Sequence, residues 1–228
     1  MFNKHISLDP RLSMIAELIG TCECCADIGC DHGRLGAFLL QNGQCSRICL
    51  TDISEPSLAK ARRLIALLGL ENRTDFFVGN GASILTRKVN AAVIAGMGGE
   101  TIADIIESSN GKLDGAKLIL EPNVAAMQLR HRLNAAGWKI ENEVLVRDGR
   151  RIYPIIVAVQ GSQQLTPIEQ IVGPVLLNQK PALLNDYAMF RIRVLKKALL
   201  GAEKGSDEAM IKAIQAELDI WEGICKCV

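Results

Sequence analysis

The chain has 228 residues, of which 49% are hydrophobic and only 4% aromatic, and its formal net charge is +1 at pH 7. This composition excludes a disordered chain and predicts a globular protein with a core of aliphatic side chains. Because the net charge is close to zero, the chain is not a strongly basic nucleic-acid binder, and any phosphate-binding surface must be local. The length fits one α/β domain with a smaller appendage.

Eight cysteines raise the question of a disulfide framework or a zinc site. Cys22, Cys24, Cys25 and Cys30 lack the paired CxxC spacing that is typical of zinc sites. We find no signal-peptide pattern at the start and no apolar run of membrane-spanning length. We therefore expect a cytoplasmic protein with reduced thiols, no metal and no membrane contact.

Short apolar runs alternate with helical patterns through the first 160 residues. Asp9 and Pro10 predict the N-cap and first position of a helix over residues 10–19. Strands are predicted at 24–28, 47–51, 75–78, 91–95, 116–120, 139–146 and 152–159, and further helices at 34–42, 55–68, 99–108 and 123–136. Helices separate the first five strands, except at the long connection between 78 and 91, so these strands should be parallel. The short turn before the last strand should instead form an antiparallel hairpin. The predicted fold is α/β, with a Rossmann-like, mostly parallel sheet.

A polar linker that begins at Gly161 precedes a helical segment. Thr166 and Glu169 form a capping box around a proline at the first helical position, and Gly173-Pro174 interrupts that helix. Apolar residues then recur at helical spacing in two segments, 183–198 and 210–221. These segments predict a small antiparallel helical hairpin with its turn at 201–206. The predicted domains are residues 1–160 and residues 161–228.

The loops that follow the first two strands are candidate ligand-binding segments. The first strand ends at Asp27 and continues through Gly29, Asp31 and His32 into a helix. Gly29 permits close approach of the backbone to a ligand, and the two aspartates provide negative charge for a cationic group. Asp52 closes the second strand at the spacing from Gly29 at which an acidic residue meets ribose hydroxyls. The alternative for the first loop is an ordinary capped turn.

The next three strands end in polar or glycine-rich segments. Asn80, between Gly79 and Gly81, either hydrogen-bonds an adenine edge or forms a plain turn. The fourth strand ends in Gly96-Met97-Gly98-Gly99, which indicates backbone that approaches a ligand or, alternatively, a flexible lid. The fifth ends in Glu121-Pro122-Asn123. We expect Asn123 to be the N-cap of the next helix, and the alternative is a polar group that faces a substrate base.

Four segments together resemble one bacterial family: ADIGCDHGRL (26–35), VIAGMGGE (93–100), LILEPN (118–123) and VGPVLL (172–177). They resemble the TrmK family of class I methyltransferases, which methylate N1 of adenine 22 in tRNA. The resemblance spans nearly the whole chain, including Arg11-Leu12 and the helical C-terminal region, and it implies tRNA as substrate and S-adenosylmethionine as methyl donor. The implied cofactor contacts are Arg11, Asp27, Gly29, Asp31, His32, Asp52, Ile53, Asn80, Gly81, Gly96 and Met97. The implied catalytic residues are Asp31 and Asn123.

Three positions depart from the family pattern. The family often has Asp at position 80, Gln at position 121 and Glu at position 52, where this chain has Asn80, Glu121 and Asp52. The changes at 80 and 52 preserve hydrogen bonding to a nucleoside. Glu121, in contrast, adds a charge near the expected site, so the resemblance assigns it no role.

Three basic clusters are candidate phosphate contacts for RNA. They are Arg130, His131 and Arg132; Arg147, Arg150 and Arg151; and Arg191, Arg193, Lys196 and Lys197. The C-terminal hairpin can alternatively dimerise through its apolar seam, so we expect a monomer or a weak homodimer. The rival functions are a nicotinamide-dependent oxidoreductase, although the first loop lacks GxGxxG, a non-catalytic RNA-binding adaptor, and a methyltransferase of another substrate.

Overall fold

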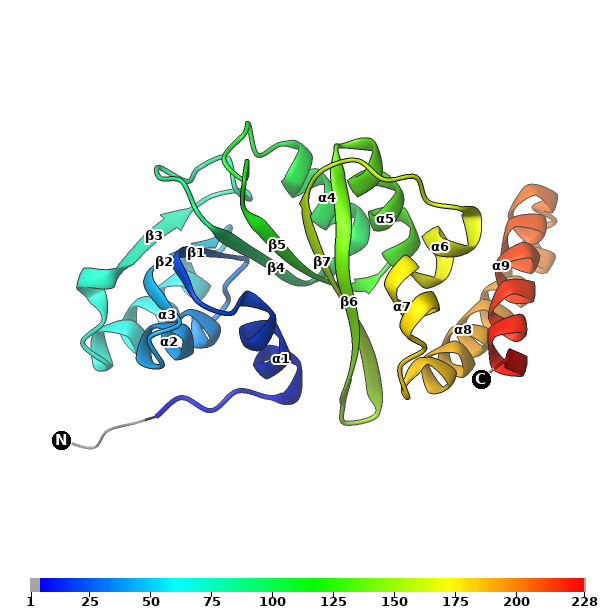
Figure 1. Cartoon of the computed structure of the whole chain (residues 1–228), viewed down its shortest axis with the longest axis horizontal. Helices are drawn as coiled ribbons and strands as arrows, with labels where there is room; N and C mark the ends of the chain where they lie inside the picture. Colours follow the sequence, from blue (N-terminus) through cyan, green and yellow to red (C-terminus); the bar gives the residue numbers. More distant parts are fainter. Residues whose placement is uncertain (1–4, 228) are drawn as a thin grey trace. The chain divides into compact units, whose positions relative to one another are not determined.

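The computed structural model describes residues 5–227. It divides into two compact units, of which the first ends at Gln164 and the second begins at Leu165. The first unit combines helices with a twisted sheet, and the second is built from helices alone (Figure 1). In the described part of the chain, no helix has the length and apolarity needed to cross a bilayer.

A seven-stranded sheet forms the centre of the first unit, with the strand order β3-β2-β1-β4-β5-β7-β6. Its strands are β1 (Cys22–Ile28), β2 (Cys45–Asp52), β3 (Thr74–Val78), β4 (Ala91–Gly98), β5 (Lys117–Val124), β6 (Trp138–Asp148) and β7 (Arg151–Gln160). Strands β1 to β5 pair in parallel, whereas β7 is antiparallel to both β5 and β6. The predicted α/β sheet with its C-terminal hairpin is therefore confirmed. The order reverses between β1 and β4, and ligands bind at such a switch point, beyond the carboxyl ends of the strands.

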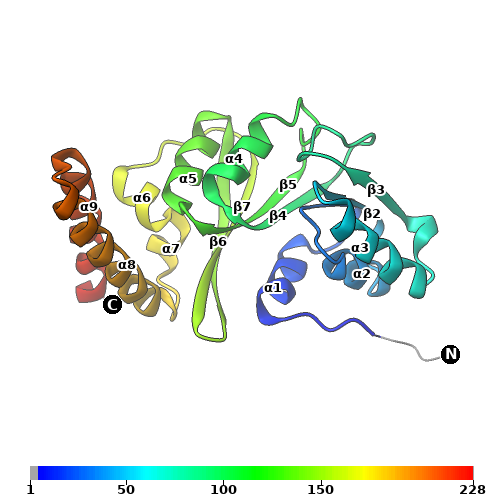
Figure 2. The same ribbon diagram turned by 180° about the vertical axis from the view of Figure 1, so that it is seen from behind.

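Helices cover both faces of this sheet (Figures 1 and 2). They are α1 (Pro10–Ile19), α2 (Arg34–Gln41), α3 (Glu55–Leu67), α4 (Gly99–Glu107) and α5 (Ala126–Ala135), with a short 3₁₀ turn at Glu71–Arg73. The main core lies between the sheet and α1, α2 and α3. There Ile15, Leu39 and Ile65 pack with Val93 and Ile119 of the sheet, and each is at most 1% exposed. These aliphatic contacts hold the strand ends of the switch point in place.

Side-chain caps mark where two of these five helices begin, α1 and α3. Asp9 caps α1 by accepting a hydrogen bond from the Leu12 N–H at 2.8 Å, and Ser54 caps α3 in the same way. The predicted cap at Asn123 is wrong, because β5 continues to Val124 and α5 begins only at Ala126. The cap position belongs to Ala125, whose backbone is left-handed (φ 59°) and whose side chain offers no hydrogen bond. The pairing of β5 with β4 thus extends past the position where sequence pattern predicted a helix.

The second unit is helical throughout its described residues. Its elements are α6 (Pro167–Val172), α7 (Pro174–Gln179), α8 (Leu184–Gly205) and α9 (Glu208–Cys227). The capping box between Thr166 and Glu169 is present as predicted. The long helices α8 and α9 form the predicted antiparallel hairpin, in which Tyr187 meets Trp221 edge-on at 5.6 Å between ring centroids. The predicted turn at 201–206 is wrong in extent, because α8 accommodates its glycines and ends only at the left-handed Ser206.

Arg130, which was predicted to contact RNA phosphate, lies on the buried face of α5. Arg130 is 1% exposed, and its Nε donates a hydrogen bond of 2.8 Å to Glu143 of β6, which is equally buried. The prediction that Arg130 contacts phosphate is therefore wrong, because its neighbours Leu129 and Leu133 turn this face of the helix toward the core. Arg132 forms ion pairs with Asp104 and Glu107 of α4.

Replacing Arg130 with Ala should lower the free energy of unfolding by about 3–5 kcal/mol, because Glu143 would remain as a buried carboxylate without this partner. The double variant Arg130→Met/Glu143→Leu should recover most of that loss, since neither charge is then buried. Urea denaturation measures both values. Equal destabilisation of the single and double variants would show that packing rather than charge pairing dominates at this position.

Candidate functional site

A cavity of about 410 Å³ opens at the carboxyl ends of the parallel strands. Its volume falls in the range that small-molecule and cofactor sites occupy. All the predicted cofactor residues line it: Arg11, Asp27, Gly29, Asp31, His32, Asp52, Ile53, Asn80, Gly81, Gly96 and Met97. Five segments far apart in sequence thus converge on one cavity at the switch point of the sheet. Asn123 is not among the lining residues.

The loop after β1 is fixed by unusual backbone conformations. Gly29 and Asp31 have left-handed φ values of 77° and 47°. The N–H groups of Gly29 and Cys30 both donate to the carbonyl of Thr51, at 2.8 and 3.0 Å, which ties this loop to the end of β2. A Cβ atom on Gly29 would lie 2.1 Å from the Met97 Cε and would push that flexible side chain aside, and the positive φ itself favours glycine here. The loop therefore forms the floor of the cavity, and Met97 from β4 lies against it.

Three carboxyl groups gather at this loop. Asp27 is 7% exposed. Asp52 accepts hydrogen bonds from the Asp31 N–H at 3.1 Å and from the Ser54 N–H at 2.8 Å. Asp31 also pairs with the Nδ1 of His32, the next residue in the helix-entry turn.

Burial raises the pKa of Asp27 to about 7, and the nearby charges of Asp52 and Asp31 act in the same direction. A carboxyl group in this state is poised between its neutral and charged forms at physiological pH. A cationic ligand beside it would favour the charged form and would relieve the repulsion among the three carboxyl groups. The cavity is therefore electrostatically suited to a positively charged group.

A buried ion pair holds the opposite wall of the cavity. The Glu121 side chain is fully buried, and its Oε2 accepts hydrogen bonds from the Arg11 Nη1 at 2.6 Å and from the Gly96 N–H at 2.9 Å. Burial raises the pKa of Glu121, and the Arg11 guanidinium opposes this effect. Arg11 also lies over the ring of Tyr153, 5.5 Å from its centroid. Glu121 thus joins α1 to the end of β4 and fixes a cation at the edge of the cavity.

The ends of β4 and β5 form an irregular ledge next to the cavity. Gly98 pairs with Val124 after two shifts in strand register, and a Cβ atom on Gly99 would lie 2.2 Å from the Ala125 carbonyl oxygen. Asn123 is exposed on this ledge, and Val124 beside it is 62% exposed. The ledge therefore offers a polar and an apolar side chain to solvent at the same edge of the sheet as the cavity.

Sequence analysis missed several lining residues. Leu12 from α1 and Thr101 and Ile105 from α4 reach the cavity, and Thr51 lines it from β2. Their sequence pattern is that of ordinary core or helix positions, so no local signal distinguishes them. The pairing of Arg11 with Glu121 was also missed, because it joins residues 110 positions apart in the chain.

Known proteins resemble this chain, in sequence and in structure, over most of its length. Residues 8–156 match a family model described as a methyltransferase domain. The chain is 30% identical over 186 residues to the tRNA (adenine(22)-N(1))-methyltransferase of Bacillus subtilis, and the match covers 78% of each protein. A solved protein of the NADB-Rossmann superfamily from Streptococcus agalactiae is 26% identical, with a TM-score of 0.89 and 97% and 98% of the two chains covered. A structure of M. capricolum TrmK with S-adenosyl-homocysteine has a TM-score of 0.82 at 24% identity and covers 97% and 99%.

Asp27→Asn should stabilise the protein without ligand, and increasingly so as the pH rises. The raised pKa of Asp27 means that its contribution to stability is fully present below its unfolded value of 3.8 and is lost as the pH rises toward about 7. The gain from the substitution should therefore grow by about 2–3 kcal/mol between pH 5 and pH 8. Urea denaturation of both proteins at the two pH values measures it. A gain that does not change with pH would contradict the raised pKa.

Proposed function

Because this chain belongs to the tRNA (adenine(22)-N1)-methyltransferase family, the TrmK family, we propose that it transfers a methyl group from S-adenosylmethionine to N1 of adenine 22 in tRNA. The resemblance that the sequence motifs predicted is confirmed by the match to the B. subtilis relative. The observation that carries the proposal is the acidic cavity at the switch point, where a buried carboxyl group with a pKa of about 7 lies beside two others.

The residues of the cavity fit S-adenosylmethionine. This molecule carries a sulfonium and an ammonium group, and the Asp27 carboxyl group lies at the centre of an acidic cluster that a cation would relieve. Its methionine part also carries a carboxylate, for which Arg11, held by Glu121, provides a fixed positive charge. Ile53 is 75% exposed at the rim and offers an apolar surface to the adenine ring. The charges of the cavity are thus complementary to both the cationic and the anionic groups of this molecule.

Each group of predicted cofactor residues has its own task in this proposal. Asp27 and Asp31 receive the cationic groups, and the carboxylate of Asp52 binds the ribose hydroxyls. Asn80 and Gly81 contact the adenine edge, and Gly96 and Met97 border the reacting centre. Gly29 and His32 shape the floor and rim, and Arg11 binds the methionine carboxylate.

The chemistry requires little covalent participation by the protein. When bound, S-adenosylmethionine supplies an electrophilic methyl group. The chain must align N1 of the adenine with it and exclude water. N1 lies on the Watson–Crick edge and is blocked in a duplex, so the target base must be unpaired or flipped out of the stack.

We propose Asp31 and Asn123 as the catalytic residues that contact the target adenine. Both side chains are exposed, and they lie at the carboxyl ends of β1 and β5, on either side of β4 in the sheet order. Methylation of N1 makes the base cationic, so the Asp31 carboxylate would stabilise the charge that develops in the transition state. The Asn123 amide would hydrogen-bond the Watson–Crick edge, and the exposed Val124 would provide an apolar platform beside it.

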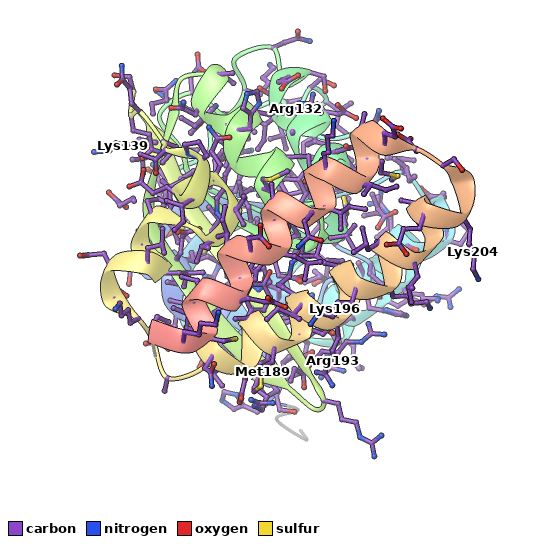
Figure 3. The ribbon with its side chains drawn as sticks, turned by 90° about the vertical axis from the view of Figure 1, so that its right-hand side faces the viewer. Arg132, Lys139, Met189, Arg193, Lys196 and Lys204 are labelled. Atoms are coloured by element: carbon purple, nitrogen blue, oxygen red, sulfur yellow. The ribbon has the colours of Figure 1, made fainter. Side chains whose placement is uncertain are left out.

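We propose that the tRNA backbone is contacted by basic side chains of α8 that do not form ion pairs within the described part of the helical hairpin. On α8, Arg191 pairs with Glu217 at 2.6 Å and Lys196 with Glu222 at 2.9 Å, so both hold the hairpin together. Arg193 and Lys197 are exposed on the same helix, where Figure 3 labels Arg193 and Lys196. Phosphate contacts of this kind position the substrate without reading its sequence.

The remaining features follow from the same proposal. We propose that residues 1–160 are the methyltransferase domain and that residues 161–228 are a coiled-coil-like helical domain that helps to hold tRNA; the family match over residues 8–156 supports the first part. The protein would act in the cytoplasm, where its tRNA substrate is found. It would be a monomer or a weak homodimer, since α8 exposes apolar side chains such as Phe190 and Val194 that permit weak self-association.

The direct test is methyl transfer from labelled S-adenosylmethionine to a tRNA transcript that carries adenine 22, followed by nucleoside analysis. We expect label in 1-methyladenosine, and none when guanine replaces adenine 22. Asp27→Ala should lower the rate about 30-fold or more, because loss of a buried charge contact costs about 2–5 kcal/mol. Glu23→Ala, which removes an exposed acidic residue of the same strand, is the matched control and should leave the rate unchanged.

Two failures of this assay have different meanings. If the protein binds S-adenosylmethionine but leaves tRNA unlabelled, it is a methyltransferase of another substrate. If it binds tRNA but no S-adenosylmethionine, the non-catalytic adaptor is the correct reading of the fold.

The double variant Arg193→Glu/Lys197→Glu should weaken tRNA binding about tenfold or more, while cofactor affinity stays the same. The number of phosphate contacts deduced from the salt dependence of tRNA binding should fall by about two. Lys204→Glu, near the end of the same helix (Figure 3), is the control and should have little effect. Filter binding over a range of salt concentrations measures both quantities. Unchanged tRNA affinity in the double variant would remove this helix from the RNA-binding surface.

A further inference from the structure

Five cysteines lie on two neighbouring strands, toward the end of the sheet opposite the cavity. Cys22, Cys24 and Cys25 belong to β1, and Cys45 and Cys49 belong to β2. Cys22 and Cys45 are the first residues of their strands and stand directly opposite each other in the parallel register. Asp27, which lines the cavity, is five residues further along β1, a distance of about 16 Å at 3.3 Å per residue. The cysteine pair is therefore outside the proposed methyl-transfer site.

The geometry of Cys22 and Cys45 is close to that of a disulfide. Their Sγ atoms are 3.2 Å apart. Neighbouring strands are spaced about 4.8 Å apart, which lies within the Cα separation that a disulfide accepts. Bond formation thus requires the two sulfur atoms to approach by only about 1.2 Å, to a bond length of about 2.05 Å. Cys24 and Cys49 are further apart, with Sγ atoms at 3.9 Å, and both are buried.

The two thiols differ in accessibility and in charge. Cys22 is partly exposed, whereas Cys45 and Cys25 are buried. Hydrogen bonds from the thiols of Cys25 and Cys45 lower the pKa of Cys22 to about 4, and the positive charge of Lys117 acts in the same direction. Cys22 is therefore the more accessible thiol of the pair, its lowered pKa favours the reactive thiolate form, and a buried thiol lies beside it. An oxidation-sensitive cysteine with a resolving partner has the same combination.

We propose that Cys22 and Cys45 form a reversible oxidation site, in which a hydroperoxide oxidises Cys22 and Cys45 then forms a disulfide with it. In the first step the Cys22 sulfur attacks a peroxide oxygen, an S–O bond forms, the O–O bond breaks, and the leaving hydroxide takes up a proton to become water. In the second step the Cys45 sulfur attacks the Cys22 sulfur, the S–S bond forms, and the S–O bond breaks. The departing hydroxide takes the Cys45 proton and leaves as water. Two thiols are oxidised, and hydrogen peroxide is reduced to two waters.

This inference does not rest on the proposed methyl transfer. It uses only the register of β1 and β2 and the surroundings of Cys22. Because the two strands are already paired at this position, the disulfide adds a link between backbones that do not need to move. The oxidised protein should therefore keep its cavity and bind S-adenosylmethionine as the reduced protein does.

The test treats the reduced full-length protein with a small excess of hydrogen peroxide and then blocks the remaining thiols. Before blocking, the intact mass should fall by about 2 Da, corresponding to two hydrogens, and a dithiol should restore it. Digestion with trypsin without reduction should yield residues 12–34 linked to residues 35–47, and the second peptide carries only Cys45. This map uses the wild-type protein and so does not depend on whether any variant folds.

Variants assign the sulfur atoms, because residues 12–34 hold four cysteines. Cys22→Ser should abolish the link, and Cys45→Ser should leave a sulfenic acid on Cys22 that a cyclic dione traps. Cys25→Ser and Cys225→Ser should both retain the link; Cys225 is a partly exposed thiol of α9 and controls for exposure alone. In the wild type, Cys22 should react with hydrogen peroxide at least about tenfold faster than Cys225.

Three results would overturn the proposal. They are a link that persists in Cys22→Ser, a wild-type protein in which Cys22 is oxidised to sulfinic acid without any link to Cys45, and equal rates of oxidation at Cys22 and Cys225. A change of more than about twofold in the affinity for S-adenosylmethionine after oxidation would contradict the separation of this pair from the cavity.

Discussion

The carboxyl group of Asp27 lies where the strand order of the sheet reverses, and the properties of the cavity depend on the burial of this group. The neighbouring parallel strand β2 brings Asp52 to this place, and the loop that follows β1 brings Asp31, so repulsion adds to desolvation. This arrangement is unfavourable in an empty cavity and favourable when a cation is present. A neutral residue at this position would make the protein without ligand more stable. The buried carboxyl group therefore lowers the stability of the empty protein, and ligand binding relieves this loss.

A second buried charge completes the site from the other side. Glu121 lies at the end of β5, and its bonds to Arg11 and Gly96 connect the first helix of the chain to the glycine-rich end of β4. The cavity thus has an acidic wall at Asp27, Asp31 and Asp52 and an opposite wall where the ion pair with Glu121 holds the Arg11 guanidinium in place. A molecule with cationic and anionic groups at one end, such as S-adenosylmethionine, matches both walls.

Sequence pattern predicted the sheet and its helices well because alternating apolar runs and helix caps are local signals, as Asp9 at the start of α1 illustrates. It failed where tertiary pairing overrides a local preference: Asn123 is a good N-cap residue, yet β5 continues beyond it because it stays paired with β4. Arg130 was predicted to be an exposed charge. Local sequence pattern cannot show that its partner Glu143, on β6, lies beside it in the fold. The lining of the cavity was predicted through motif resemblance, whereas the support of Arg11 by Glu121 is a long-range contact without a local signature.

The central claim is that Asp27 is a buried carboxyl group, partly protonated at neutral pH, that becomes fully charged when the cofactor binds. Titration of carbon-13-labelled aspartate carboxyl groups by NMR, with Asp27→Asn to assign the resonance, tests it directly. We predict a midpoint at about pH 7 in the free protein. With saturating S-adenosylmethionine, the midpoint should fall to between about pH 4 and about pH 6, because an opposite charge nearby lowers a carboxyl pKa by about 1–3 units. An Asp27 midpoint near pH 4 in the free protein, or one that the cofactor leaves unchanged, would contradict this account.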